Sequence, residues 1–196
     1  GSSLELINIW KWGKFSLTNQ SQFQYFGISG QNKPDTGITS ISNLTSLKYY
    51  ISKTQYISIY NKSSYQDLIN GVGGSSPGIQ FFSECKNREL DIHLKRIFRL
   101  PTMNDLFWSP GGNPNLIPES GWDLKASFSL QNKHNIFKFE AFAGRLNNGI
   151  IWRPNGLFWQ PINEFLITRY GINSSWQVIW PSQFVQFEIQ ALQSQN

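Results

Sequence analysis

Side chains that could do chemistry are few in this chain and widely spaced. Asp105 and Glu119 are the best pair of carboxylates for general acid–base catalysis. No serine, histidine and aspartate stand in an order that would support a nucleophilic triad. The single Cys85 excludes an internal disulfide, and neither His93 nor His134 belongs to a cysteine–histidine cluster that would bind zinc or iron. We therefore expect no enzyme activity, no metal site and no cofactor.

The acidic pair lies in a segment that has a structural interpretation as well as a functional one. In the functional interpretation, its polar side chains contact a ligand. In the structural one, Arg99 forms charge-assisted hydrogen bonds with Asp105 and Glu119, and these tie the loop to its flanking strands. Prolines stiffen this loop and lower the entropy of the unfolded chain; they are Pro101, Pro114 and Pro118. We favour the structural interpretation.

Aromatic side chains gather where strands are expected to meet long loops, namely Trp108, Trp152, Phe158 and Trp159. They would form either a stacking platform for a planar or sugar-like ligand or a girdle at a membrane interface. Amphipathic rings favour the level of the lipid headgroups. We favour the girdle, because Trp10 and Trp12 lie beside a short turn and fit a second girdle at the opposite end.

The composition excludes several classes of protein. The chain has 196 residues and a net charge of +5 but no basic run, so we expect no nucleic-acid-binding face. No run of about eighteen apolar residues occurs, which excludes a membrane-spanning helix. A membrane-spanning strand needs only about ten residues of alternating polarity, so a membrane β-barrel is compatible with the composition.

Apolar and polar residues alternate along many segments, which indicates strands with one apolar face. The clearest case is 122–131, where even-numbered residues are apolar and odd-numbered ones polar. The polar face would line a lumen or meet solvent. Similar segments occur at 91–100, 137–143 and 185–191, and 4–12, 15–27, 38–50 and 55–65 are rich in residues that favour strands. We expect about ten strands.

The connections between these strands alternate between short and long. Short ones are expected near 12–14, 52–54, 87–89, 132–135 and 178–182, and long ones near 28–37, 66–77, 101–120 and 147–160. In an antiparallel meander, alternate connections lie at the same end, as in outer-membrane barrels. The sequence predicts an all-β fold: an antiparallel up-and-down β-barrel of about ten strands, or a barrel segment, with long loops at one end and short turns at the other.

One stretch, 96–122, resembles a signature of TonB-dependent outer-membrane receptors. Its first part has the family's order and spacing in Arg99, Pro101, Thr102, Asn104, Asp105, Leu106, Phe107 and Trp108. Its second part does so in Gly112, Asn113, Pro114, Asn115, Leu116, Pro118 and Glu119. A further likeness covers Trp159, Pro161 and Asn163 and then Tyr170–Asn173, although Asn173 stands where the family has glutamate.

Receptors of this family consist of a plug domain, an energy-coupling segment and a barrel of more than about twenty strands. This chain is too short for that whole arrangement, and no plug-like segment is recognisable. The resemblance therefore implies part of a barrel, a shortened barrel or an engineered derivative. Residues 1–3 are interpreted as a cloning scar, and 4–196 as a single β-barrel domain without a plug.

The resemblance also implies uptake of a large nutrient, such as a siderophore or cobalamin, at the bacterial outer membrane. Without a plug, the chain is not expected to be active alone. Its expected partners are outer-membrane lipid, the nutrient and the remainder of a larger receptor or assembly. The candidate ligand-binding residues are Asn104, Asp105, Trp108, Asn113, Asn115, Trp152 and Trp159. The candidate structural residues of the motif are Arg99, Pro101, Thr102, Gly112, Pro114, Pro118 and Glu119.

Two alternatives stay open at this point. In a miniaturised or soluble ligand-binding barrel, about ten strands close around a small ligand, and the segment Phe184–Asn196 pairs with the first strand. An open fragment would leave two unpaired edges. The end of the chain lacks the terminal aromatic residue of bacterial outer-membrane barrels, which fits an internal or truncated segment. A secreted carbohydrate-binding all-β module would use exposed tryptophans, but it leaves the stretch 96–122 unexplained.

Overall fold

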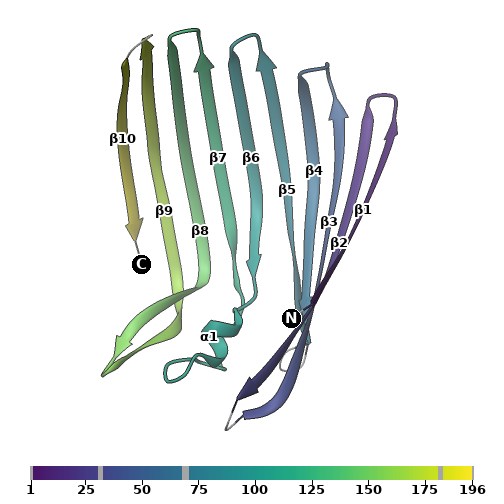
Figure 1. Ribbon diagram of the computed structural model, residues 1–196, viewed down its shortest axis with the longest axis vertical. Coiled ribbons are helices and arrows are strands. Elements are labelled where there is room, and N and C mark those ends of the chain that lie inside the picture. The colour runs from purple at the N-terminus through teal and green to yellow at the C-terminus, as the bar shows by residue number, and fades with distance from the viewer. Residues whose placement is uncertain (1, 31–32, 68–70, 181–182, 196) are drawn as a thin grey trace.

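The computed structural model contains a single sheet of ten antiparallel strands in sequence order, joined as an up-and-down meander (Figure 1). It describes residues 2–30, 33–67, 71–180 and 183–195. The strands are β1 (Ser2–Trp12), β2 (Phe15–Gly30), β3 (Lys33–Tyr50), β4 (Gln55–Gln66), β5 (Val72–Cys85), β6 (Arg88–Arg99), β7 (Glu119–Gln131), β8 (Asn135–Asn155), β9 (Phe158–Trp180) and β10 (Gln183–Gln195). The predicted all-β fold and the expected number of strands are confirmed.

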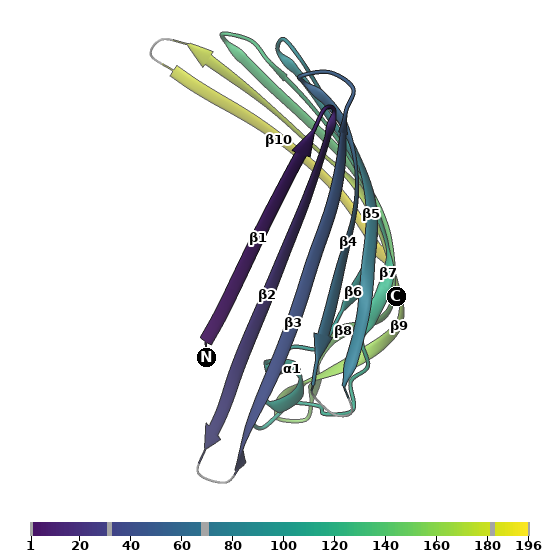
Figure 2. The same ribbon diagram turned by 90° about the vertical axis from the view of Figure 1, so that its right-hand side faces the viewer.

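The sheet is curved but not closed (Figure 2). In the described part of the chain, β1 pairs only with β2, and β10 pairs only with β9. The pairing of 184–196 with the first strand, considered for a closed barrel, is therefore wrong for this structure. The strands lie at an angle to one another in Figure 2, as expected from the right-handed twist of strands. The result is a barrel segment, with one free edge on each side.

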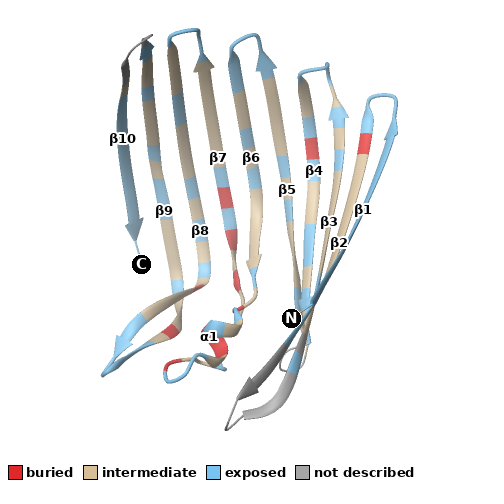
Figure 3. Ribbon diagram, in the orientation of Figure 1, coloured by how far each residue is buried: buried red, intermediate tan, exposed pale blue. Residues whose placement is uncertain are grey.

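The two faces of the sheet differ in a sense opposite to that of a water-soluble protein. Polar side chains crowd together on the concave face, where Ser58 is 2% exposed and Asp123 is 8% exposed. Large apolar side chains such as Leu124 and Ile59 project from the convex face and are 44% and 60% exposed. Figure 3 accordingly shows few buried positions along the strands. The apolar face needs a cover that is not water.

The exposed area supports the same conclusion. The chain exposes 13136 Å², whereas a compact soluble protein of this length exposes about 9,500 Å². Among the described residues, Leu106 and Leu116 are the only buried hydrophobic side chains, and both lie between β6 and β7 rather than beneath the sheet. The fold therefore has no conventional core, and its stability depends on strand pairing and on the medium at each face.

A polar group interrupts the apolar face at β2 and β3. It consists of Asn19 and Ser21 on β2 and their partners Thr45 and Asn43 on β3. Their side chains form six hydrogen bonds with one another, at 2.9–3.4 Å, which use all six of their N–H and O–H donors. Because an unpaired donor is costly away from water, this closed arrangement suits an apolar surrounding.

The connections follow the predicted asymmetry, but their lengths differ from expectation. Tight turns join the strand pairs at one end, for example Gly13–Lys14 between β1 and β2. At the other end, the loop expected at 147–160 consists mostly of strand, because β8 extends to Asn155 and β9 begins at Phe158. The loop expected at 66–77 is likewise shortened by β5, which begins at Val72. Pairing satisfies backbone groups that a loop would leave to water.

Three of the expected connections fall partly beyond the described residues, and one of them is the loop expected at 66–77, which contains residues 68–70. Residues 31–32 lie within the loop expected at 28–37, whose flanks belong to β2 and β3. Residues 181–182 lie within the short connection expected at 178–182, after β9 ends at Trp180. The connection between β6 and β7 is a true long loop, and it contains the helix α1 (Met103–Phe107), which the sequence analysis did not predict.

No helix in the described ranges is long and apolar enough to span a membrane.

Candidate functional site

The end of the sheet opposite the tight turns is called the rim; it contains the β6–β7 loop and the β8–β9 hairpin. The loop between β6 and β7, residues 100–118, is its most highly organised part. Thr102 caps α1: its hydroxyl accepts from the Asp105 backbone N–H at 3.2 Å, and the Asp105 carboxylate accepts from the Thr102 N–H at 2.9 Å. This reciprocal pair is a capping box. The Thr-x-x-Asp spacing was therefore the signal in the sequence that could have revealed the helix.

Asp105 is the centre of the loop and is 5% exposed. One carboxylate oxygen accepts from the Thr102 hydroxyl at 2.8 Å as well as from its N–H, and the other accepts from the Trp152 indole N–H at 3.1 Å. An Arg99 guanidinium nitrogen lies 3.8 Å from the same carboxylate. Asp105 thus fixes the short helix to both β6 and β8, and no oxygen of its carboxylate is left without a donor.

Glu119, at the start of β7, closes the loop from the other side. It is 5% exposed, forms an ion pair with Arg99, and accepts a hydrogen bond from the Ile150 N–H on β8. Arg99 therefore lies between two buried carboxylates, and the arrangement agrees with the structural interpretation of Arg99, Asp105 and Glu119. Two anions share one cation here, so removing the guanidinium would leave both carboxylates inadequately paired.

Two asparagines connect the loop to β9. The Asn113 side-chain amide donates to the Pro161 carbonyl at 3.0 Å, and its oxygen accepts from the Asn115 N–H at 3.0 Å. Asn163 accepts from the Ile117 N–H and donates to the Ile117 carbonyl, both at 2.9 Å. The sequence analysis placed Asn163 in the family likeness but not among the candidate site residues. Its side chain imitates a strand partner for the loop backbone.

The loop also requires close backbone approach at Gly112, one of the predicted motif residues. A Cβ atom at this position would lie 2.6 Å from the Trp108 nitrogen and 2.7 Å from the Leu106 carbonyl oxygen. Pro101 is buried and Pro118 is half-buried, whereas Thr102 and Pro114 are exposed. The seven motif residues therefore all lie in or beside this one loop, and several of them shape it directly.

The seven candidate ligand-binding residues divide into two groups. Asp105, Asn113 and Trp152 are engaged in the internal hydrogen bonds of the loop. The other four are exposed and lie on the rim: Asn104, Trp108, Asn115 and Trp159. Trp108 is 56% exposed and Trp159 is 60% exposed, so both indoles are accessible to a molecule that approaches the rim. The tryptophans suggested for a girdle thus differ in their surroundings: Trp108 and Trp159 are exposed, whereas the Trp152 indole donates to Asp105 in the loop.

Below the rim, the concave face carries ion pairs between different strands. Asp123 lies 2.7 Å from Arg169 and 4.0 Å from Lys95. Lys125 pairs with Glu140 on the next strand. This face is polar and carries charges of both signs. Within the described residues, it presents no group of three or more potential metal ligands. It can accommodate a polar surface or water, and it offers no evident chemistry.

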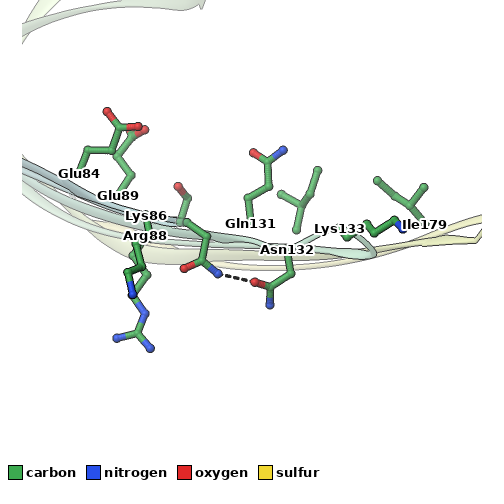
Figure 4. Close-up of a pocket in the computed structure, with 11 residues that line it drawn as sticks. Glu84, Lys86, Arg88, Glu89, Gln131, Asn132, Lys133 and Ile179 are labelled. Atoms are coloured by element: carbon green, nitrogen blue, oxygen red, sulfur yellow. Dashed lines mark hydrogen bonds between the residues drawn. The ribbon is translucent and has the colours of Figure 1, made fainter. Parts of the chain in front are cut away.

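A hollow of about 710 Å³ lies at the end with the tight turns (Figure 4). Glu84 and Glu89 are register partners across the β5–β6 turn and extend to the same side, whereas Arg88 extends to the other side. Like charges directly opposite each other are unfavourable in a sheet. The sequence analysis missed this carboxylate pair, although the two residues flank a tight turn at Lys86–Asn87.

Comparison with known proteins gives a local likeness in sequence and an extensive likeness in fold. No protein-family model matches the chain. The vitamin B12 transporter BtuB of Photobacterium profundum is 31% identical over 71 residues, which cover 34% of this chain and 12% of that protein. BtuB of Vibrio vulnificus is 32% identical over 68 residues, which cover 34% of this chain and 11% of that protein.

Solved structures resemble the chain over nearly all of its length. The copper transporter OprC matches 99% of it with a TM-score of 0.78 at 11% identity, and this covers 37% of OprC. The siderophore receptor PirA from Pseudomonas aeruginosa matches 98% with a TM-score of 0.77 at 13% identity, covering 39% of PirA. The chain thus spans well under half the length of these proteins. It is similar in fold, and over a third of its sequence, to part of the barrel of a TonB-dependent outer-membrane receptor.

Proposed function

We propose that this chain forms part of the wall of a bacterial outer-membrane receptor that takes up a large nutrient, and that it recognises the nutrient through the rim. Copper, siderophores and vitamin B12 are the ligands named for the similar proteins. In this proposal the chain does no catalysis. It acts together with a plug and the remaining strands, and it does not transport alone.

The observation that carries the proposal is the inverted polarity of the sheet. Leu124 and Ile59 stand on a convex face that is open to the surroundings, while Asp123 and Ser58 are buried on the concave face. In water, such a sheet would expose its apolar side chains and would associate through them. In a bilayer, lipid covers the convex face and the concave face lines an aqueous interior. The fold therefore makes sense as a segment of a membrane barrel.

Recognition is proposed to lie at the rim, because the rim combines rigidity with exposed aromatic side chains. The Asp105 and Glu119 contacts hold the loop, and Trp108 and Trp159 remain more than half exposed on it. Exposed indoles on a rigid support bind planar or apolar groups at a small cost in conformational entropy. Asn104 and Asn115 add amides that can donate to and accept from a polar ligand.

Membrane placement is tested by reconstituting the chain into liposomes of phosphatidylcholine and of its dibrominated form. Bromine quenches tryptophan on contact, so we expect strong quenching for the convex-face residues Trp122 and Trp176. Replacement of either by phenylalanine would remove the corresponding share of the quenched signal. Equal emission in both kinds of liposome would show that lipid does not cover this face, and it would overturn the proposal.

Rim recognition is tested separately by titrating the reconstituted chain with cyanocobalamin, ferric enterobactin and copper(II). We expect at least one of them to bind, and the double variant Trp108→Ala and Trp159→Ala to weaken that binding at least about tenfold. The matched control is Trp10→Ala with Trp12→Ala, at the opposite end of the sheet. Unchanged binding by the rim variant, or an equal loss in the control, would refute recognition at the rim.

A further inference from the structure

A row of three side chains crosses the convex face just below the rim. Arg96 on β6 is the register partner of Trp122 on β7, which in turn pairs with Arg145 on β8. Their inward-facing neighbours confirm the side on which the row stands, since Lys95 and Asp123 meet on the concave face. Neighbouring strands are about 4.8 Å apart, so the two arginine Cα atoms lie about 10 Å apart with the indole between them.

Neither arginine of this row has an acceptor within the described residues, and the other face holds all nearby carboxylates. On β6, β7 and β8 these are Glu89, Asp91, Glu119, Asp123 and Glu140, each at a concave-face position of the register. In contrast, Arg99, Arg153 and Arg169 each form an ion pair with a carboxylate. Two guanidinium groups on one side of an apolar face therefore have no ion-pair partner among the residues that the structure describes.

The two rows that follow on the side of the tight turns are uniformly apolar. The next row consists of Leu94, Leu124 and Ala143, and the one after it of Ile92, Ala126 and Ala141. Leu94 is 40% exposed and Leu124 is 44% exposed. Ala143 and Ala141 follow one another on the same face of β8, and Ala126 on β7 is the register partner of Ala141. Together they form a smooth alanine track that leads away from the arginines beside larger leucine and isoleucine side chains. Cationic heads above an apolar track complement an anionic amphiphile.

We propose that Arg96, Trp122 and Arg145 bind the phosphate of a lipid headgroup, with an acyl chain of the lipid lying on the alanine track. Guanidinium groups bind phosphate oxygens through paired N–H donors, and the indole suits the level of the headgroup. The long aliphatic stems allow both arginines to reach up to one headgroup from neighbouring apolar surface. This inference rests on the proposed membrane placement and adds a specific lipid site to it.

The test compares lipid retention by the reconstituted chain, measured by native mass spectrometry after release from nanodiscs. Nanodiscs contain phosphatidylcholine alone or with phosphatidic acid, which presents a phosphate monoester. The site variant is Arg96→Gln with Arg145→Gln. The control variant is Arg88→Gln with Lys133→Gln, which removes the same charge at the end with the tight turns. We expect the unaltered chain and the control to prefer phosphatidic acid by about tenfold, and the site variant to lose that preference.

Several outcomes would overturn the inference. One is that the site variant keeps its preference for phosphatidic acid. Another is that the control variant loses this preference equally, which would indicate diffuse electrostatic attraction. Displacement of phosphatidic acid by inorganic phosphate would indicate a site for a free anion instead of a lipid. Quenching by dibrominated phosphatidylcholine, which has no net charge, is measured on the same samples. If quenching occurs without lipid preference, only this inference fails; if quenching is absent, the proposed membrane placement fails first.

Discussion

Replacement of Asp105 by alanine should release the rim loop while leaving the sheet intact. The carboxylate accepts three hydrogen bonds, from the Thr102 N–H, the Thr102 hydroxyl and the Trp152 indole. Hydrogen bonds to a charged group contribute about 1.5–3 kcal/mol each, but Thr102 is exposed and water would replace part of the loss. We therefore expect loop opening to become easier by about 3 kcal/mol.

Such a change corresponds to an increase of roughly 100-fold in the open population of the loop. Hydrogen–deuterium exchange of the chain in detergent micelles measures it directly. The reporters are the loop amides bonded inside the rim, including Asn113 N–H to the Asp105 carbonyl at 2.8 Å and Leu106 N–H to the Thr102 carbonyl at 3.1 Å. Peptides from 101–118 should exchange about 100-fold faster, whereas those from β6 and β7 should keep their rates.

The matched control is Asn104→Ala, which alters a neighbouring exposed side chain in the same helix and removes no described side-chain hydrogen bond. It should change loop exchange by less than about threefold, in keeping with a surface substitution. The reasoning would be refuted if Asp105→Ala accelerated loop exchange no more than this control. It would also be refuted if the strands accelerated equally, because Asp105 would then stabilise the whole sheet rather than the loop.

Two further predictions concern the faces of the sheet. Asp123→Ala leaves Arg169 and Lys95 without their carboxylate on the concave face. Because both cations are well exposed, water replaces part of the loss, and we expect unfolding in detergent to become easier by about 1–2 kcal/mol. A midpoint in guanidinium equal to that of the unaltered chain would contradict this. Asn43→Ala removes four of the six hydrogen bonds within the polar group on β2 and β3. We expect the free energy of unfolding to fall by about 1–2 kcal/mol in the same assay. The control is Thr168→Val on the same face, for which we expect no loss.

The alternation of polarity determined most of the fold. Residues 122–131 alternate without exception, and the structure places Leu124 on the exposed face and Asp123 on the buried one. Side-chain direction in a strand has a period of two, so the assignment of residues to faces follows from the sequence alone. What the alternation does not determine is which face is concave and crowded and which is convex and exposed. The curvature of the sheet decided that.

The extent of the rim hairpins was not predictable from local signals. A loop was expected at 147–160, yet β8 continues through Asn147, Asn148 and Gly149 to Asn155 because β9 runs alongside as its partner. Strand formation depends on a neighbour that is distant in sequence, and glycine or asparagine lowers only the local preference. The helix α1 was missed for a different reason, since its capping box was present in the sequence but its five residues are too few for a visible periodicity.

By itself, the sequence determined the sheet, its two faces, the order of its strands and the stretch 96–122 that carries the family likeness, because each of these depends on residues close together in the chain. Only the tertiary structure decided which candidate residues meet. It brought Asp105 to Trp152, Glu119 to Ile150 and Asn163 to Ile117 across strands, and it set Arg96 and Arg145 on either side of Trp122. Register joins such pairs, and register is set by backbone pairing along whole strands rather than by any local pattern.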